Sequence, residues 1–493
     1  MSYNRSFLID EPEILDSPEE VMATLGKDGR RKWVYPTLSL GKHHKRRKLF
    51  GWALIVLFVA LPIIQINGKP AVLIDFVHRE FALFGLLLYP TDTLLLLLLM
   101  ISTVLGVGLF TALLGRVWCG WACPQTVYLE FVFRPIEKWI EGKEHIQRRR
   151  DAGPWNWDKI WRKSLKFLIY LAISLALAHV FISYFLGWSN LIDWIQRPPQ
   201  ENWGFFVMMA GTTGLILYDF GYFREQMCTI ACPYARMQSV LLDEDSMIVS
   251  YDPNRGEPRK KRSKKIIAKE LAGEVPAQGD CIDCFACVRT CPTGIDIRDG
   301  LQMECIACAQ CIDACDVIME KIDKPKGLIR YTSENELLGK STHKIRPRTL
   351  VYSALMLSVA VALVAMVFSR GAFDINVGRS VGEPFTVLPD GRIANRLRFR
   401  VRNQQQQATA FSITTIQPAD TKVQVIGASP VQLAPEEMKR VEAWIVIPAD
   451  AFTGDSIEAT FELLFDNGMR EMVPFTLLGP SADAPATQTS EAS

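Results

Sequence analysis

The sequence predicts a multi-domain membrane protein that combines an α-helical transmembrane bundle, a cysteine-rich domain and a C-terminal all-β sandwich. Three observations predict this fold class: five long apolar segments, eight cysteines within residues 281–315, and an alternating polar and apolar pattern after Arg370. The 493 residues are too many for one core, and 49% hydrophobic residues with a positive mean hydropathy favour the membrane class. The net charge of +2 alone says little about partners.

The eight clustered cysteines repeat the spacing C-x2-C-x2-C-x3-C twice. This spacing predicts a dicluster ferredoxin-like domain with two [4Fe-4S] clusters, in which the fourth cysteine of each motif reaches across to the other cluster. Electron transfer is therefore the expected function. The first cluster would take Cys281, Cys284, Cys287 and Cys315, and the second Cys305, Cys308, Cys311 and Cys291.

Structural zinc is the alternative for such cysteines, but zinc needs four ligands per site and does not require this repeated set of offsets. Disulfides are less favoured still. One departure from the repeat is Asp316, which follows Cys315 where Pro292 follows Cys291. It leaves all eight thiols in place and adds a charge that could tune its cluster.

The apolar segments are each expected to cross a hydrocarbon core of roughly 30 Å as a helix of about 20 residues. Pro62 should kink or end the first of them. Residues 81–90 are apolar but too short to span, so a re-entrant or interfacial segment is expected there. The five expected spans are Leu49–Ile66, Thr91–Gly115, Ser164–Trp188, Gly204–Phe223 and Leu350–Phe368.

The distribution of lysine and arginine predicts the orientation. The basic runs His43–Lys48, Arg148–Arg150 and Arg259–Lys265 mark cytoplasmic segments, whereas residues 69–80 and 190–203 carry few basic residues. The N-terminus is then inside, without a cleavable signal peptide, and the C-terminus is outside. The cysteine-rich domain lies in the cytoplasm, where a reducing environment preserves thiols.

The expected domains are a cytoplasmic N-terminal segment, a four-span region, a cytoplasmic cysteine-rich segment, a fifth span, a sandwich of immunoglobulin type and a disordered tail. The sandwich is expected from six alternating strands, with the arginines of residues 396–402 on a solvated face. The sequence contains no phosphate-binding loop, dinucleotide fingerprint or hydrolase triad, and no nucleic-acid partner is expected. The domain ranges are 1–48, 49–223, 224–347, 348–370, 371–480 and 481–493; the strands are near 397–401, 411–416, 423–426, 441–447, 457–465 and 472–477.

The four remaining cysteines form a second repeat, C-x3-C-P, at Cys119–Pro124 and Cys228–Pro233, and each pair follows an expected span. Either a helix runs through each pair and places both thiols on one face, or each proline begins a new helix with the preceding cysteine at its N-cap. A nearby helix end could lower the thiol pKa. The site could hold Cu(I), form a redox dithiol, or ligate zinc or a further iron–sulfur centre; simple buried packing is the alternative. Its members are Cys119, Cys123, Cys228 and Cys232.

The histidines are weaker candidates. His179 lies within the third span and could partner haem or a quinone, although a satisfied polar packing role explains it as well. His78 is expected in the outer interface. His43 and His44 belong to a basic run and receive no chemical role.

The combination of Arg116-Val-Trp-Cys-Gly-Trp-Ala-Cys-Pro124, Cys228–Pro233 and the paired cluster motifs resembles the FixG-like (RdxA/CcoG) cytochrome c oxidase accessory proteins of bacteria. The resemblance covers nearly the whole chain, and membrane ferredoxins of nitrate and nitrous oxide respiration share the paired C-x3-C-P arrangement. It implies a multi-pass inner-membrane protein with a periplasmic C-terminal domain. It also implies assembly of a cbb-type oxidase through reduction of Cu(II) to Cu(I), with oxidase subunits or copper chaperones as partners.

Three functions follow as hypotheses. In the first, an unidentified cytoplasmic donor supplies electrons that reach an ion held near the four C-x3-C-P cysteines, as a cupric reductase would require. In the second, the chain is a quinol-linked subunit of a respiratory reductase. In the third, it is a non-enzymatic assembly scaffold whose clusters are structural.

Overall fold

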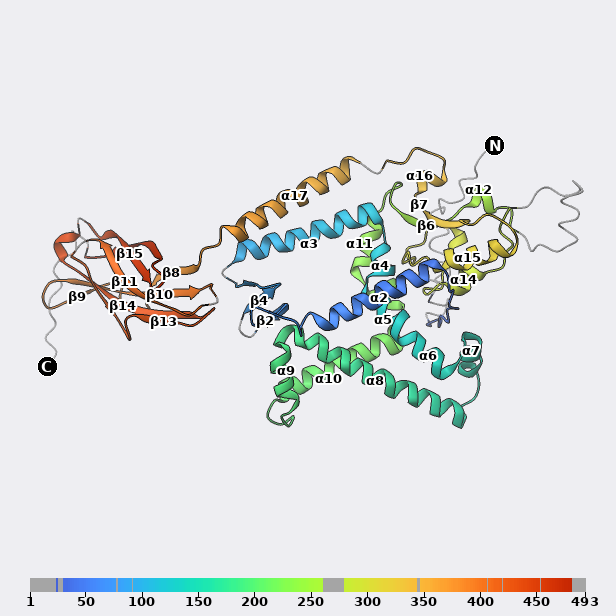
Figure 1. Ribbon diagram of the computed structural model, residues 1–493, viewed down its shortest axis with the longest axis horizontal. Helices are drawn as coiled ribbons and strands as arrows, with labels where there is room; N and C mark the ends of the chain where they lie inside the picture. The colour runs from blue at the N-terminus through green and yellow to red at the C-terminus, as the bar shows by residue number, and fades with distance from the viewer. Residues whose placement is uncertain are drawn as a thin grey trace, which may run out of the picture. The chain divides into compact units, whose positions relative to one another are not determined.

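The computed structural model describes residue 24 and residues 30–480, apart from 77–78, 91, 260–278, 344–345, 406, 419 and 453. The chain forms two compact units, Met1–Val364 and Ala365–Ser493 (Figure 1). Four expectations lie largely or wholly outside the described residues: most of the N-terminal segment before residue 42, the interfacial role of His78, most of the basic run Arg259–Lys265, and the disordered tail 481–493.

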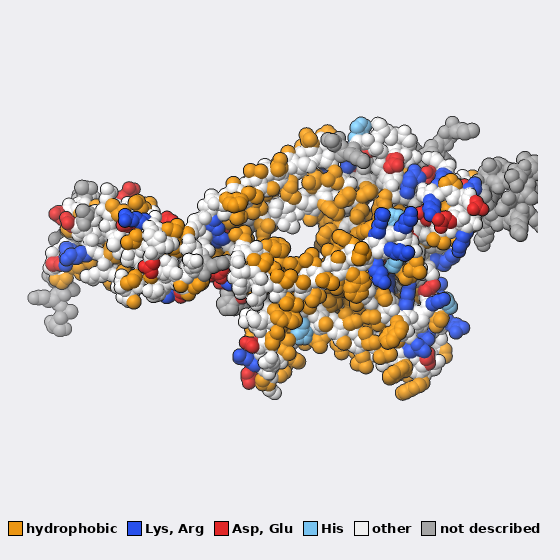
Figure 2. Space-filling view, in the orientation of Figure 1, with side chains coloured by type: hydrophobic (Ala, Val, Ile, Leu, Met, Phe, Trp, Pro, Cys, Tyr) orange, Lys and Arg blue, Asp and Glu red, His pale blue; other side chains and the backbone are white. Residues whose placement is uncertain are grey.

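Four helices among the described residues are long and apolar enough to cross a membrane. Most of their side chains are not buried within the chain, and such apolar surfaces need lipid rather than water around them (Figure 2). They confirm the second to fifth expected spans. These helices are α3 (Thr93–Leu114), α8 (Trp157–Leu186), α10 (Trp203–Tyr218) with its π-helical continuation η3 (Asp219–Phe223), and α17 (Pro347–Phe368).

The first expected span differs from the structure. Helix α2 runs over Lys42–Ala60, so its first two turns are the basic run, and it ends just before Pro62. Its apolar part, residues 49–60, would extend about 18 Å at 1.5 Å per residue, short of a hydrocarbon core of roughly 30 Å. This helix is therefore not one of the four that are long and apolar enough to span.

The segment between α2 and α3 contains short strands instead of a membrane-crossing helix. Strands β3, β4 and β5 pair in order as an antiparallel sheet, and the apolar stretch 81–90 supplies two of them. The expectation that this stretch does not span is thus consistent with the structure. The strands are β1 (Gln65–Ile66), β2 (Lys69–Pro70), β3 (Val72–Asp75), β4 (Glu80–Leu83) and β5 (Leu86–Leu88).

Short helices carry the chain between the spans. On the first loop the chain forms α4 (Val117–Trp121), α5 (Pro124–Tyr128), the π-helix η2 (Leu129–Phe133), α6 (Arg134–Glu141) and α7 (Glu144–Ala152). Helix α9 (Trp188–Ile195) links α8 to α10, and η4 (Met227–Ala231) and α11 (Pro233–Leu241) follow η3.

The cysteine-rich domain is built around a two-stranded antiparallel sheet, β6 with β7, that joins its two ends. Cysteines occupy much of its interior, where they pack with Val249, Ile297, Ile312 and Met319. The elements are β6 (Ile248–Tyr251), α12 (Pro253–Gly256), α14 (Ala286–Thr290), η5 (Ile297–Asp299), α15 (Gln310–Lys321), β7 (Ile329–Thr332) and α16 (Glu334–Leu337).

The second unit is a two-sheet antiparallel sandwich, which confirms the expected immunoglobulin-like architecture. One sheet has the order β12-β14-β10-β8 with β9 on β10, and the other has the order β13-β11-β15-β16. In β10 the arginines face outward while Leu397, Phe399 and Val401 are fully buried, as the alternation predicts.

All six expected strands of the sandwich are present, and the structure adds β8, β9 and β13. The strands are β8 (Phe373–Arg379), β9 (Thr386–Val387), β10 (Ile393–Asn403), β11 (Thr409–Gln417), β12 (Lys422–Val425), β13 (Val431–Leu433), β14 (Met438–Ile447), β15 (Ser456–Phe465) and β16 (Arg470–Leu478), with a short 3₁₀ turn η6 (Ala449–Ala451).

Candidate iron–sulfur and thiol site

Eight cysteines of the cysteine-rich domain line two cavities, each with about 350 Å³ of free space. One cavity, here called the distal cavity, is lined by Cys281, Cys284, Cys287 and Cys315. The other, the proximal cavity, is lined by Cys291, Cys305, Cys308 and Cys311, with Cys287 also at its wall. Apart from Cys287, which lines both cavities, the thiols in each wall are those that the crossed pairing assigns to one cluster.

The two cysteine loops share an unusual backbone. Asp283 and Phe285 in the first loop, and Ala307 and Ala309 in the second, all have positive φ between 52° and 60°. These residues lie two and four positions after the first cysteine of each motif, so the two loops repeat one conformation. Non-glycine residues rarely adopt this region, and such strain clusters at functional sites. Loops of this kind can gather backbone N–H groups around an anionic group.

The cavities fit [4Fe-4S] clusters in the chemistry of their donors. Each offers four thiols, and its remaining walls are largely apolar. Burial raises the pKa of Cys287 and of Cys308 to about 12, and of Cys305 to about 11. A thiol ligand must lose its proton to bind iron, so cluster binding would have to displace protons from these buried groups.

The carboxylate of Asp316 is held by a hydrogen bond to the backbone. Its Oδ1 accepts a hydrogen bond from the backbone N–H of Gly327 at 3.0 Å and so fixes the chain after α15. Around the distal cavity, Arg298 pairs with Asp296 at 2.5 Å and with Asp283 at 2.6 Å. The charged groups on this side are therefore paired with one another.

The C-x3-C-P motifs adopt the second of the two expected local structures. Pro124 and Pro233 stand in the first turns of α5 and α11, and Cys123 and Cys232 are the extended N-cap residues, with ψ of 126° and 112°. A residue before proline avoids helical geometry, and a proline in the first turn loses no helical hydrogen bond. The helix does not run through either motif.

Each motif is preceded by the same sharp reversal of the chain. Gly115 (φ 56°, ψ −132°) ends α3, and Arg224 (φ 52°, ψ −119°) ends η3, each four residues before the first cysteine of its motif. A side chain at Gly115 would lie 2.1 Å from the carbonyl oxygen of Met247, so glycine is required there. The repeat in sequence is thus a repeat in structure.

The structure brings the two motifs together beside the proximal cavity. Cys119, Ile306 and Cys308 form one buried cluster, against which Cys228 and Tyr234 pack. The Cys119 thiol donates to Oε1 of Gln238 in α11 at 3.1 Å. Among the described residues, no three histidine, cysteine, aspartate or glutamate side chains converge closely enough to hold one ion. A single-ion site with three or more such ligands is therefore not preformed there.

At Cys119, Cys123 and Cys228, burial outweighs the lowering of the thiol pKa that a nearby helix end was expected to cause. Burial raises the pKa of Cys119 to about 12 and raises the pKa of Cys123 and Cys228 as well, with the neighbouring motif cysteines adding to the effect. Removal of these sulfur atoms from water disfavours the thiolate more than the short helices favour it.

Gly120 connects the first motif to the proximal cavity. A Cβ at this position would lie 2.4 Å from the carbonyl oxygen of Ile306 and 2.8 Å from the backbone nitrogen and Cα of Cys308. Only glycine allows this approach. Arg116 reinforces it, since its guanidinium donates to the carbonyl oxygens of Met303 and Cys305 in the cluster loop and of Ala235 in α11.

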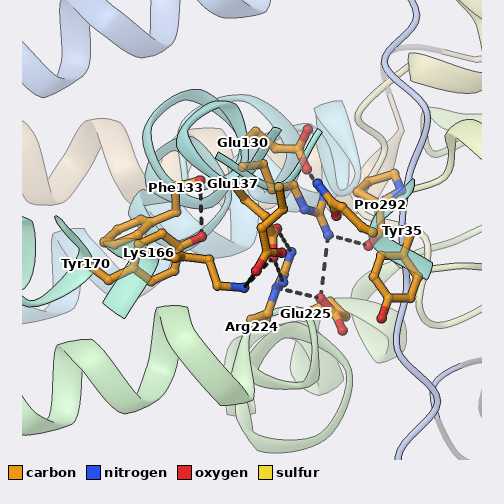
Figure 3. A network of polar contacts seen from close by, with 12 residues as sticks. Tyr35, Glu130, Phe133, Glu137, Lys166, Tyr170, Arg224, Glu225 and Pro292 are labelled. Carbon is orange, nitrogen blue, oxygen red and sulfur yellow. Dashed lines mark hydrogen bonds and ion pairs between the residues drawn. The ribbon is translucent and has the colours of Figure 1, made fainter. Parts of the chain in front are cut away.

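A network of buried ion pairs holds the helices next to this site (Figure 3). Glu137 in α6 receives both terminal nitrogens of Arg224, at 3.2 and 3.1 Å, and the ammonium of Lys166 at 3.2 Å. Burial alone would raise the pKa of Glu137, but Arg224 and Lys166 outweigh it and lower this pKa to about 2. The carboxylate is therefore ionised, and its pairs fix the left-handed Arg224.

Arg134 extends the network to the cysteine-rich domain. It pairs with Glu130 and donates to the carbonyl oxygen of Pro292, directly after Cys291, at 3.1 Å. Glu130 in turn accepts from the amide of Gln310 at 2.7 Å. These contacts dock the loops of the proximal cavity onto η2 and α6.

Sequence reasoning missed the charged residues of this site. Arg47 was counted only in the positive-inside run, and Arg116, Glu130, Glu137 and Arg224 received no role. One available signal is that Arg116 and Arg224 each directly follow an apolar span and lie three and four residues, respectively, before the first cysteine of a C-x3-C-P motif. Nothing in one sequence indicates which partners they meet.

The histidines have structural partners. His179 Nδ1 donates to the carbonyl oxygen of Leu175 at 2.7 Å, within its own helix. His43 Nδ1 lies 3.0 Å from Oδ1 of Asp313, and the backbone N–H groups of His43 and His44 both donate to that carboxylate. Asp313 thereby caps the N-terminus of α2.

Comparison with known families agrees with this geometry. Residues 223–334 match a 4Fe-4S dicluster domain, residues 96–147 match a 4Fe-4S binding domain, and residues 363–480 match the IG-like fold found at the C-terminus of FixG. The first C-x3-C-P motif lies within the second of these regions. The fold and the site define a membrane-bound iron–sulfur protein of the ferredoxin type that acts in electron transfer.

Similar whole proteins identify the family. RdxA of Cereibacter sphaeroides is 37% identical over 73% of this chain and 76% of RdxA, and RdxB of the same organism is 36% identical over 81% and 85%. The nitrogen fixation protein FixG of Rhizobium meliloti is 31% identical over 89% of this chain and 90% of FixG. The chain belongs to the FixG and RdxA family, which confirms the resemblance seen in its motifs.

Proposed function

We propose that this protein reduces Cu(II) to Cu(I) with electrons from a cytoplasmic donor, and that the Cu(I) is loaded into a cbb-type cytochrome oxidase during assembly. Two [4Fe-4S] clusters, held by Cys281, Cys284, Cys287 and Cys315 and by Cys305, Cys308, Cys311 and Cys291, would supply the electrons one at a time. Reduction of one Cu(II) consumes one electron. The oxidase as destination rests on the family alone.

The observation that carries this proposal is the contact of Gly120 with the Cys308 loop. Together with the packing of Cys119 and Cys228 against Ile306 and Cys308, it brings one thiol of each motif beside the Cys308 loop. Thiolate ligands favour the softer Cu(I) over Cu(II), so Cys119, Cys123, Cys228 and Cys232 would stabilise the product of the reduction. Their raised pKa values mean that copper, in binding there, would displace protons.

The proposed orientation places the cysteine-rich domain in the cytoplasm and the sandwich in the periplasm of the bacterial inner membrane. The contact of Asp313 with the first turn of α2 supports the first part, because it puts the basic run His43–Lys48 beside the cysteine-rich domain. The sandwich would then be available to an oxidase subunit or a copper chaperone outside.

Anaerobically purified protein provides the test. Protein reduced with dithionite and freed of the excess should be reoxidised when Cu(II) is added, with about one Cu(I) formed per electron lost. Replacement of all four C-x3-C-P cysteines by serine should abolish Cu(I) formation while the sulfide held by the dicluster domain remains. Thr229→Ala, beside Cys228 in η4, is the matched control. Unchanged Cu(I) formation in the four-serine variant would remove these thiols from the reaction.

A second candidate function, electron exchange with quinol, is favoured by one cavity. This cavity lies between α8, α9 and α10 and is lined mainly by apolar side chains such as Trp194, Phe205 and Met209, together with the polar residues His179, Arg197 and Asn202. Because Nδ1 of His179 donates to Leu175, its Nε2 is left as an acceptor for a quinol hydroxyl. Reduction of the iron–sulfur centres by a water-soluble quinol, lost in His179→Leu, would support this function.

A further inference from the structure

We propose that Arg47 is a fixed positive charge that raises the reduction potential of the cluster in the proximal cavity above that of the cluster in the distal cavity. The electron would then collect at the cluster beside the first C-x3-C-P motif. This inference rests on the proposed occupation of the two cavities, and it assigns a direction of flow: from the distal cavity to the proximal cavity and on toward the membrane thiols.

The position of Arg47 is unusual for an arginine. Its side chain is 0% exposed, in the middle of a buried stripe of α2 formed with His44 and Gly51. Its Nε donates to the carbonyl oxygen of Gly120 at 2.8 Å. Both terminal nitrogens, Nη1 and Nη2, are buried and have no hydrogen-bond partner among the described residues. A buried guanidinium with two unpaired nitrogens is costly, so a compensating negative group is expected nearby.

A cluster held in the proximal cavity would supply such a negative group. Arg47 contacts Gly120, and Gly120 lies against the backbone of Cys308, one of the four thiols of that cavity. Arg47 is also the charge that most strongly opposes the effect of burial on the Cys308 thiol, by favouring its thiolate. A cluster with four thiolates carries net negative charge, which the guanidinium would balance.

The neighbours of Arg47 do not cancel its charge. Glu130 is its closest acidic neighbour, but that carboxylate already pairs with Arg134 and accepts from Gln310. Burial and Arg47 itself lower the pKa of His44, which keeps this imidazole neutral. Arg47, Glu130 and Arg134 together therefore carry one net positive charge, and all three side chains are buried. Arg134 also lies 3.5 Å from Glu225, but that carboxylate is shared with Arg31 and Arg224.

The distal cavity also has a buried cation in its wall, Arg298, which favours the thiolate of Cys287. Unlike Arg47, this guanidinium is paired with two carboxylates, Asp296 and Asp283. Asp316 adds a further negative charge close to Cys315. The two sets of thiols are alike, so the difference in surrounding charge should decide which cluster is reduced first. Adding an electron makes a cluster more negative, and a buried cation nearby favours that state.

Redox titration followed by electron paramagnetic resonance tests the proposal on copper-free, full-length protein. Arg47→Gln should lower the reduction potential of the more positive couple. The expected change is at least tenfold in the equilibrium constant for reduction, which is about 59 mV for one electron. The other couple should move less. Arg47→Lys should keep most of the wild-type potential, and Arg46→Gln, an exposed neighbour in the same helix, should change neither couple. An unmoved positive couple in Arg47→Gln with both clusters present would overturn the proposal.

A second pair of variants keeps the test decisive if Arg47→Gln loses a cluster. Cys305→Ser should alter the signal of the more positive couple, and Cys284→Ser that of the more negative one. The reverse assignment would contradict the inferred direction of flow. Failure of the proposed function would give different results. Protein that contains no iron and no sulfide would show that the cavities hold no clusters. Clusters with the expected potentials but no Cu(I) formation would support the role of Arg47 and contradict copper reduction.

Discussion

The sandwich and the cysteine-rich region are stabilised in different ways. In the sandwich, aromatic and aliphatic side chains fill the space between two sheets, with Phe373 stacked on Phe465 and Phe399 edge-on to Phe461. Its buried polar side chains among the described residues are Asn395, Asn403 and Thr409, all uncharged. An interior of this kind needs nothing beyond the chain itself.

The region around the cysteines combines apolar side chains with many buried charges. Arg47, Arg116, Glu130, Glu137 and Arg224 are all buried there, together with thiols that line two cavities. Buried ion pairs add little net stability over apolar packing but are severely destabilising when one partner is lost. The sandwich is therefore built to fold by itself, whereas the cysteine-rich region is built to hold a cofactor in a fixed electrostatic environment.

The largest expected effect comes from removing a cluster ligand. Cys308→Ala should lower iron from about eight to about four atoms per chain, because one of two four-iron groups loses its site. The thermal transition of the first unit should fall or vanish, while that of the sandwich should stay. Metal analysis with calorimetry on the full chain measures both. Loss of the sandwich transition as well would show that the two units do not differ in this way.

The reciprocal change is in the sandwich. Phe399 is fully buried between the sheets, so Phe399→Ala should destabilise the sandwich by about 3–5 kcal/mol through lost burial and a cavity. Iron content and cluster spectra should stay at wild-type values. Met472→Ala, at a strongly exposed strand position, is the control and should change stability little. A fall in iron content in Phe399→Ala would contradict the independence of the two units.

Acid should destabilise the first unit more than the sandwich. The folded pKa of Glu137, about 2, lies below its ordinary value of 4.5, so its stabilising contribution is complete above about pH 4.5 and is lost as pH falls toward 2. This contribution is on the order of 3 kcal/mol. Thermal unfolding between pH 6 and pH 3 measures it, and Glu137→Gln should flatten the acid dependence of the first unit. If the stability of the Glu137→Gln variant fell equally steeply with falling pH, groups other than Glu137 would be responsible for the acid dependence.

The smallest effect is expected from the outward arginines of β10. Arg396 and Glu442 form a partly exposed pair on adjacent strands, and Arg396→Ala should change the stability of the sandwich little, because exposed pairs are solvated and screened. Chemical unfolding of the sandwich followed by tryptophan fluorescence would measure this change. The loss of stability in Arg396→Ala can then be compared with that in Glu137→Gln. The two variants remove the same kind of ion pair, one at the surface and one in the interior.

Much of the fold followed from local patterns. The spans at residues 93–114, 157–186, 203–223 and 347–368 could be predicted because a run of apolar residues long enough to cross lipid has few other solutions. The six sandwich strands could be predicted because alternation fixes which face is buried. The extent of α2 could not, since the basic run joins the helix only because Asp313, far along the chain, accepts hydrogen bonds from its first turn.

The sequence by itself determined the chemistry of this protein: eight thiols at offsets that suit two clusters, two C-x3-C-P motifs, and apolar segments that require a membrane. Only the tertiary structure decided what lies beside these groups. In the folded chain, Gly120 lies against the Cys308 loop and Arg47 lies next to the proximal cavity. The same chain reversal precedes each C-x3-C-P motif. The reason is physical: ligand spacing is a local property of the chain, whereas the charge around a site comes from residues that only folding brings together.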